Sequence, residues 1–246
     1  MKKLVLITND DGILDSGIQA LRNRVGQFYD TIMVAPDSEQ SAVSHALTLN
    51  RPLRVNKIDK STMSVDGTPT DCVMLSLKGI LDRKPDLVIS GINKGANLGD
   101  DVIYSGTVAG AAEAAILEVP SVSFSLVEPE NTDVELGAEI AVRIIKTVMD
   151  NKLPSGIFLN VNIPAIWTGK NIEVTCLGRR SYREVIVEKI DPRGKPYYWI
   201  AGQVEKWEGE SNCDFAAIER GNVSITPLQL NMTASDFLDE VNKWKF

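Results

Sequence analysis

Short apolar runs alternate with longer amphipathic stretches through the first two thirds of the chain. The runs are rich in apolar and β-branched residues, and the first of them is continuous rather than alternating, which predicts strands buried in a parallel sheet. They fall at residues 4–8, 31–36, 61–65, 87–91, 122–126 and 157–163. Apolar residues at helical spacing predict helices over residues 16–26, 69–80, 105–118 and 133–149. This alternation predicts an α/β fold with a doubly wound, mainly parallel sheet.

The pattern changes after Pro164. Residues 171–210 hold two β-prone runs around a Pro-Arg-Gly turn, which predicts a long β-hairpin that projects from the sheet. A returning strand over residues 223–227 and a closing helix over residues 233–244 follow. We therefore expect a sheet domain over residues 1–165 and a C-terminal extension over residues 166–246.

The first predicted strand ends in Asn9-Asp10-Asp11-Gly12. In an open α/β sheet, ligands bind at the carboxyl ends of the strands, so this segment lies where a site is expected. Two adjacent carboxylates repel each other unless a cation joins them, and their oxygens suit hard divalent ions. An acidic turn that caps the following helix is the alternative. The pairing of the two aspartates favours the metal site.

Three further loops are expected at the same edge of the sheet. Residues 35–45 are rich in hydroxyl groups, and residues 90–101 combine three glycines with asparagines and a lysine. Ser105-Gly106-Thr107 opens an alanine-rich helix, where free backbone N–H groups and the helix dipole favour an anion. Each loop alone is weak support, because turns use the same residues. Together with the aspartates, they predict a divalent cation beside a phosphate-sized anion site.

Composition narrows the chemistry further. The net charge of -7 at pH 7 argues against a nucleic-acid polymer as partner, because surfaces that bind such polymers are basic. Because His45 is the single histidine, a multi-histidine zinc site within the chain is excluded. We expect His45 to have only an accessory role in catalysis. Three dispersed cysteines, with no signal-peptide or membrane-spanning run, predict a cytoplasmic protein with reduced thiols.

Five segments carry motifs that occur in the same order in one known family. They are Asn9 to Gly12, Ala35-Pro36-Asp37 with Ser41, Gly67 to Val73, Ser90 to Asn97 and Tyr104 to Val108. These segments closely resemble the SurE (survival protein E) family of metal-dependent nucleotidases. Residues 193–199 and 224–227 also fit, so the resemblance covers most of the chain.

The resemblance implies a Rossmann-like domain whose C-terminal extension is exchanged between subunits of a homodimer or homotetramer. It implies hydrolysis of nucleoside 5′- and 3′-monophosphates to nucleoside and phosphate, and shortening of polyphosphate in some members. The substrate would be a small nucleotide, with no membrane partner. Many members have proline where this chain has Ala96, which would make that turn slightly less rigid.

Carried over position by position, the resemblance implies one divalent ion, Mg²⁺ or Mn²⁺, per subunit. Its ligands would be Asp10, Asp11, Ser41 and Asn93. The resemblance places Asn97, Ser105, Gly106 and Thr107 at the phosphate, and we expect Asn9 and Lys94 to join them. The groups expected to act in catalysis are Asp10, Asp11, Asn97 and Ser105.

The residue types also indicate a mechanism. With one histidine and no cysteine in these loops, a water activated by a divalent ion is the expected nucleophile. Asp10 or Asp11 would orient or deprotonate this water. Lys94, Ser105, Thr107 and the helix N-terminus would stabilise the charge on the transferring phosphoryl group. Covalent attack by an aspartate is the competing mechanism.

A Mg²⁺-binding, receiver-like signalling domain is the alternative function, because it also carries an acidic pair after its first strand. Such a domain needs an aspartate at the end of its central strand and a lysine at the end of a later one, and residues 87–90 and 122–125 supply neither. A dehalogenase-type phosphatase would separate its two aspartates by one residue. A dinucleotide-binding dehydrogenase would need Gly-x-Gly-x-x-Gly after the first strand.

Overall fold

The computed structural model of the protein describes residues 2–127, 133–165, 167 and 171–245. Its central sheet contains β1 (Leu4–Thr8), β2 (Asp30–Pro36), β3 (Val55–Lys57), β4 (Thr62–Val65), β5 (Leu87–Lys94), β6 (Ser121–Leu126), β7 (Ile157–Ile163), β8 (Ile172–Val174) and β11 (Val223–Gln229). The strand order is β3-β4-β2-β1-β5-β6-β7-β11-β8. The neighbours from β4 to β7 all run parallel. The order reverses between β1 and β5, which confirms the predicted Rossmann-like, doubly wound sheet.

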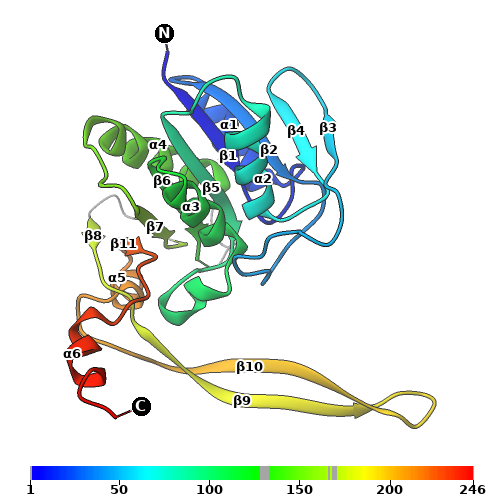
Figure 1. Ribbon diagram of the computed structural model, residues 1–246, viewed down its shortest axis with the longest axis vertical. Helices are drawn as coiled ribbons and strands as arrows, with labels where there is room; N and C mark the ends of the chain where they lie inside the picture. The colour runs from blue at the N-terminus through cyan, green and yellow to red at the C-terminus, as the bar shows by residue number, and fades with distance from the viewer. Residues whose placement is uncertain (1, 128–132, 166, 168–170, 246) are drawn as a thin grey trace.

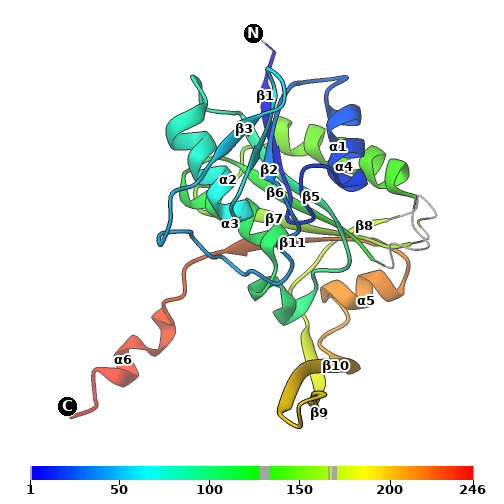
Figure 2. The same cartoon turned by 90° about the vertical axis from the view of Figure 1, so that its right-hand side faces the viewer.

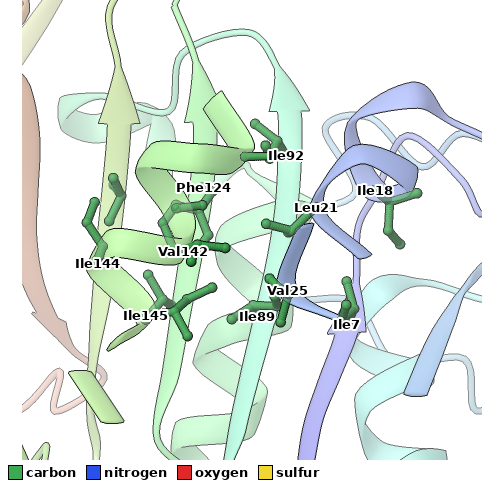
Figure 3. Close-up of a cluster of buried hydrophobic side chains, with 14 of the residues drawn as sticks. Ile7, Ile18, Leu21, Val25, Ile89, Ile92, Phe124, Val142, Ile144 and Ile145 are labelled. Atoms are coloured by element: carbon green, nitrogen blue, oxygen red, sulfur yellow. The ribbon is translucent and has the colours of Figure 1, made fainter. Parts of the chain in front are cut away.

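Helices cover both faces of this sheet (Figure 2). On one face lie α1 (Ser16–Val25) and α4 (Val134–Asp150), and on the other lie α2 (Pro69–Leu75) and α3 (Gly106–Ile116). Figure 3 shows Leu21 of α1 and Ile145 of α4 packed with Ile7, Ile89 and Phe124 of the strands. These helices hold the strand ends that carry the site in fixed positions.

Both faces of the first strand are buried. Ile7 belongs to the core under α1 and α4, whereas Leu6 packs with Val34 and Val73 on the face that α2 covers. Successive side chains of a strand point to opposite faces, so a strand covered on both sides needs an unbroken apolar run. This is the physical reason for the pattern from which β1 was predicted.

A capping box fixes the start of α2. Thr68 Oγ1 accepts a hydrogen bond from the Asp71 N–H at 3.1 Å, and Asp71 Oδ2 accepts one from the Thr68 N–H at 2.9 Å. This reciprocal pair satisfies N–H groups that the start of a helix leaves free. After Leu75 the chain continues into a π-helical turn over Ser76–Ile80.

After β7, two strands of the chain join the sheet and two others project from it. β11 pairs antiparallel with β7 and parallel with β8. In the sequence between β8 and β11, β9 (Arg179–Ile190) and β10 (Pro196–Glu208) form an antiparallel ribbon that projects far from the body (Figure 1). The projecting hairpin predicted within residues 171–210 is therefore confirmed, with β8 as a separate strand of the sheet.

Several short elements differ from the sequence predictions. Periodicity misses β3, β8 and α5 (Asp214–Glu219), because strands of three residues and a helix of less than two turns are too short to show a period. The helix predicted over residues 233–244 is wrong in extent: a 3₁₀ turn, η4 (Ser235–Phe237), leads into a single turn, α6 (Leu238–Val241). This terminal segment projects away from the body (Figure 2), and little packing supports a longer helix there. Residue 166, at the predicted domain boundary, lies outside the described residues.

Candidate active site

A cavity of about 330 Å³ opens beyond the carboxyl ends of β1 and β5, where the strand order reverses. Its lining includes these predicted site residues: Asp10, Asp11, Ser41, Asn93, Lys94, Asn97 and Ser105. The other lining residues are Glu39, Ala42, Ala96, Asp101 and Tyr104. Four separate segments of the chain, each close to a strand end or a helix start, therefore meet in one cavity.

The acidic pair does not cap the following helix. Asp15 occupies that position, and its Oδ1 accepts a hydrogen bond from the Gly17 N–H at 2.6 Å. The capping alternative for Asp10 and Asp11 is therefore wrong, and both carboxylates line the cavity.

Asp10 and Asp11 are both unfavourable as free anions. Asp10 is only 5 % exposed, and this burial raises the pKa of its carboxyl, although the Thr107 hydroxyl donates a hydrogen bond to Oδ1. Burial and the charge of Asp10 raise the pKa of Asp11 to about 6, although the Lys94 N–H donates to Asp11 Oδ2 at 3.3 Å. A cation between the two carboxylates would remove this penalty.

Without a bound cation, we expect the acidic pair to make the protein less stable as the pH rises. The pKa of Asp11 rises from 3.8 to about 6 on folding, so between these values the folded protein holds a proton that the unfolded chain has released. The free energy of unfolding therefore falls as the pH rises through this window. After allowance for solvent screening of this partly open group, we expect a fall of about 1–2 kcal/mol.

Urea denaturation in the presence of a chelator, at about pH 4.5 and about pH 7.5, measures this effect. The change in the free energy of unfolding between the two pH values is compared for the unmodified protein and Asp11→Asn. The difference between these two changes isolates the contribution of Asp11 from that of other carboxyls. Equal changes for the two proteins would contradict the assignment.

Lys94 lies at the end of β5, not in a loop as predicted. Its ammonium forms an ion pair with Asp15, and this hydrogen bond raises the pKa of Lys94. The other charged residues of the lining are all acidic: Asp10, Asp11, Glu39 and Asp101. A phosphate would meet net negative charge here, so it requires an added cation.

The donor atoms of the cavity fit a hard divalent ion. Asn93 Nδ2 donates to the Gly95 carbonyl at 2.7 Å, which leaves the amide oxygen of Asn93 as a ligand. Ser41 Oγ donates to Glu39 Oε1 at 2.6 Å and keeps its lone pairs. With the two aspartates, these oxygens form the donor set that Mg²⁺ and Mn²⁺ prefer. A cluster of three or more histidine, cysteine, aspartate or glutamate ligands does not occur among the described residues, so neutral oxygens are needed.

Asn9 and Thr107 do not line the cavity but lie directly behind it. Asn9 Nδ2 donates to the Gly12 carbonyl at 2.9 Å and closes the turn that carries the aspartates. Asn9 Oδ1 is buried, and within the described ranges it has no hydrogen-bond partner. The Thr107 hydroxyl donates a hydrogen bond to Asp10 Oδ1, so Thr107 contacts the acidic pair.

The start of α3 forms one side of the cavity. Ser105 caps this helix, and its Oγ accepts from the Val108 N–H at 3.1 Å. The first-turn N–H groups of Gly106 and Thr107 have no intrahelical acceptor, and together with the helix dipole they favour an anion. The turn η2 (Gly99–Ile103) leads the chain into this position.

Asn97 is held rigidly by polar side chains of β6 and β7. Its N–H donates to Asn162 Oδ1 at 2.8 Å, and its carbonyl accepts from Asn160 and Asn162 at 2.8 and 2.9 Å. Its Nδ2 donates to Ser125 Oγ at 2.8 Å. A buried polar network that is satisfied in this way fixes the geometry of the loop. Asparagines within the apolar run of β7 were the sequence signal for this support.

Two buried carboxylates that the sequence analysis missed also support the site. Glu113, only 3 % exposed, lies with its Oε2 at 2.8 Å from His45 Nε2. Its signal was an acidic residue inside an otherwise small and apolar helix. Asp214, on α5, accepts hydrogen bonds from the N–H groups of Gly99, Gly178 and Phe215 at 2.7, 2.9 and 2.9 Å. It thereby joins η2 to the base of the ribbon.

The fold and the cavity together define a class: an α/β protein with a Rossmann-like sheet and an acidic, oxygen-rich cavity at its switch point. The family model described as survival protein SurE matches residues 5–184. The chain belongs to the SurE family.

Individual relatives agree with this assignment. The chain is 46 % identical over 245 residues to a 5'-nucleotidase SurE from Geotalea daltonii, with 98 % of each chain covered. It is 42 % identical over 255 residues to a 5'-nucleotidase SurE from Natranaerobius thermophilus, again with 98 % of each chain covered. The crystal structure of the SurE protein from Aquifex aeolicus has a TM-score of 0.88 and 44 % identity, covering 97 % of this chain and 98 % of that one. The resemblance inferred from the motifs is confirmed.

Proposed function

We propose that this SurE protein is a divalent-metal-dependent phosphomonoesterase that hydrolyses nucleoside 5′-monophosphates, and also 3′-monophosphates, to nucleoside and phosphate. Its relatives named 5'-nucleotidase, similar over nearly the whole chain, support this activity. The observation that carries the proposal is the cavity in which Asp10 and Asp11 meet neutral oxygen donors and a helix N-terminus. Such a site suits a cation and a phosphate bound as a unit.

The residues of the cavity would have different roles in the reaction. A Mg²⁺ or Mn²⁺ ion held by Asp10, Asp11, Ser41 and Asn93 would lower the pKa of a water molecule and neutralise charge on the phosphoryl oxygens. Asp11, the more open carboxylate, would accept the proton of the attacking water. Asn97, Ser105 and the first-turn N–H groups of α3 would bind the phosphoryl oxygens. Thr107 would hold Asp10 in place.

Release of inorganic phosphate from AMP in the presence of Mn²⁺ or Mg²⁺ tests the proposal. We expect turnover that a chelator abolishes and that added metal restores, with 3′-AMP as a second substrate. A stable phosphoaspartate formed from a small phosphodonor, without turnover of AMP, would instead support the receiver-like alternative.

We also propose that the site shortens polyphosphate, whose terminal phosphoryl group presents a similar anion, and that the protein acts in the cytoplasm. No helix within the described ranges is long and apolar enough to cross a membrane.

Gly106→Ala should reduce kcat/KM for AMP about 10–100-fold, because there is no room for a side chain beside Asp10. A Cβ at Gly106 would lie 2.9 Å from Asp10 Cβ and 3.1 Å from Asp10 Oδ2, so the carboxylate or the helix start must shift. Gly79→Ala is the matched control, because a Cβ there meets no atom within 4 Å. Steady-state kinetics of the two variants measure the effect, and an unchanged kcat/KM for Gly106→Ala would contradict it.

His45→Ala should retain measurable turnover of AMP. His45 does not line the acidic cavity, and its Nε2 is bound to Glu113. A water activated by a divalent ion needs no histidine base, so we expect kcat to fall less than about tenfold. Complete loss of kcat, with folding and metal binding intact, would overturn this expectation and make His45 the general acid.

We propose that residues 166–246 form an extension that joins subunits into a homodimer or homotetramer. The ribbon exposes Tyr198, Trp199 and Ile200, with Ile200 97 % exposed. An isolated two-stranded ribbon is marginal in water, and aromatic side chains are enriched in interfaces. Light scattering of the full chain and of a variant without the ribbon tests this. A monomeric full chain at micromolar concentration would overturn the proposal.

A further inference from the structure

Two cysteines that are far apart in the sequence lie on adjacent backbone segments in the fold. Cys176 and Cys213 form an isolated parallel β-bridge. The Cys176 N–H donates to the Asn212 carbonyl at 3.2 Å, and the Asp214 N–H donates to the Cys176 carbonyl at 2.9 Å. Paired backbone segments lie about 4.8 Å apart, and disulfides join residues whose Cα atoms are about 4.4–6.8 Å apart. The backbone of the two cysteines therefore has the separation that a disulfide needs.

The pair lies at the base of the ribbon formed by β9 and β10. Cys176 comes just before β9 and Cys213 just after β10, so the whole ribbon lies between them in the sequence. Both strands of the ribbon meet the body next to α5 (Figure 1). In the thiol form, non-covalent contacts hold this base, among them the stacked rings of Trp207 and Phe215 at 5.1 Å. A bond between the two sulfurs would close the ribbon covalently where it joins the body.

The two thiols differ in their access to solvent. Cys176 is exposed, whereas Cys213 is 1 % exposed and packs with Leu98 and Phe215. Burial raises the pKa of Cys213, and the nearby charge of Cys176 raises it further. Cys213 therefore stays protonated and reacts slowly with an oxidant from solution. An exposed thiol with a second thiol next to it is the arrangement of redox-sensing cysteines.

We propose that Cys176 and Cys213 are a redox-modification site, at which a peroxide drives formation of a reversible disulfide across the base of the ribbon. Disulfides of cytosolic proteins are usually transient and redox-sensing. The site is therefore compatible with the reduced thiols expected from the sequence. The spacing of the cysteines gave no sign of the pair, because the ribbon separates them.

The exposed cysteine reacts first. The Cys176 thiolate attacks one oxygen of hydrogen peroxide, and the O–O bond breaks to give a sulfenic acid and a hydroxide, which takes up the proton that the thiol released. The Cys213 sulfur then attacks the Cys176 sulfur and displaces the sulfenic hydroxyl, which leaves as water with the Cys213 proton. The two thiols lose two electrons in total, and the peroxide is reduced to two molecules of water. A dithiol reverses the reaction by thiol–disulfide exchange.

Treatment of the full chain with hydrogen peroxide tests the proposal. We expect free thiols to fall from three to one, with the mass of the chain lowered by that of two hydrogen atoms. Peptide mapping should find Cys176 joined to Cys213, and Cys72, which is fully buried, should stay reduced. Dithiothreitol should restore all three thiols. These measurements do not depend on hydrolysis of a nucleotide, so they stand apart from the proposed function.

Urea denaturation tests the effect of the bond on the fold. The disulfide closes a long loop and so restricts the unfolded chain, which should raise the denaturation midpoint by about 0.5–1 M relative to the reduced protein. Cys176→Ser, at an exposed position, is the matched control and should show no change of midpoint after the same treatment. Cys213→Ala removes the second thiol, so Cys176 should accumulate as a sulfenic acid that dimedone traps.

Four outcomes would overturn the proposal. Three of them concern the chemistry: three free thiols after peroxide treatment, oxidation of Cys176 to a sulfinic acid while Cys213 stays free, and chains cross-linked to one another through Cys176. The fourth is a disulfide that lowers the denaturation midpoint, which would show that the folded backbone must be distorted to form the bond.

Discussion

Asp11→Asn should reduce kcat/KM for AMP by at least about 10³-fold, which corresponds to about 4 kcal/mol of transition-state stabilisation. The amide keeps the shape of the side chain but loses its charge, and a neutral oxygen is a weaker ligand for a divalent ion. The substitution also removes the carboxylate that we propose accepts the proton of the attacking water. Phosphate release measured over a range of Mg²⁺ and Mn²⁺ concentrations checks the effect.

The same variant should be at least as stable as the unmodified protein. Burial and the neighbouring Asp10 make an ionised Asp11 unfavourable in the fold, so its loss removes a repulsion. Asp82→Asn, the same change at an exposed position after the π-helical turn, is the control and should leave both activity and stability unchanged. An Asp11→Asn variant as active as the unmodified protein at saturating Mg²⁺ would refute the metal assignment.

Asp214→Ala should lower the free energy of unfolding by about 3 kcal/mol or more, a large part of the total for a domain of this kind. The fully buried carboxylate accepts hydrogen bonds from Gly99, Gly178 and Phe215. Its removal leaves these three backbone N–H groups without an acceptor, and each such buried group is costly. Urea denaturation of the two proteins measures the loss.

Asp214→Asn is the conservative comparison. Its single amide oxygen can keep part of the hydrogen bonding, so its loss of stability should lie between those of Asp214→Ala and the unmodified protein. Because Gly99 follows the loop that carries Asn97, Asp214→Ala should also raise KM for AMP. A stability within about 1 kcal/mol of the unmodified protein would show that water replaces the carboxylate.

Local patterns predicted most of the sheet domain. A buried strand needs an unbroken apolar run on both faces, and residues 4–8 show one. A helix start needs acceptors for its free N–H groups, which Thr68 and Asp71 supply within four positions. These requirements act over a few residues, so the sequence displays them directly. The short strand β3 and the single turn α6 have no such pattern, because neighbouring segments decide whether they form.

The sequence by itself determined that Asp10 and Asp11 end the first strand, where a parallel sheet binds its ligands, and that Ser105 begins a helix. Both follow from chemistry between near neighbours in the chain. The tertiary structure alone decided which distant groups support them. It pairs Lys94 with Asp15, His45 with Glu113 and Gly99 with Asp214, across 79, 68 and 115 positions. Such pairs depend on the order of strands in the sheet, which the burial of the whole chain determines and no local spacing encodes.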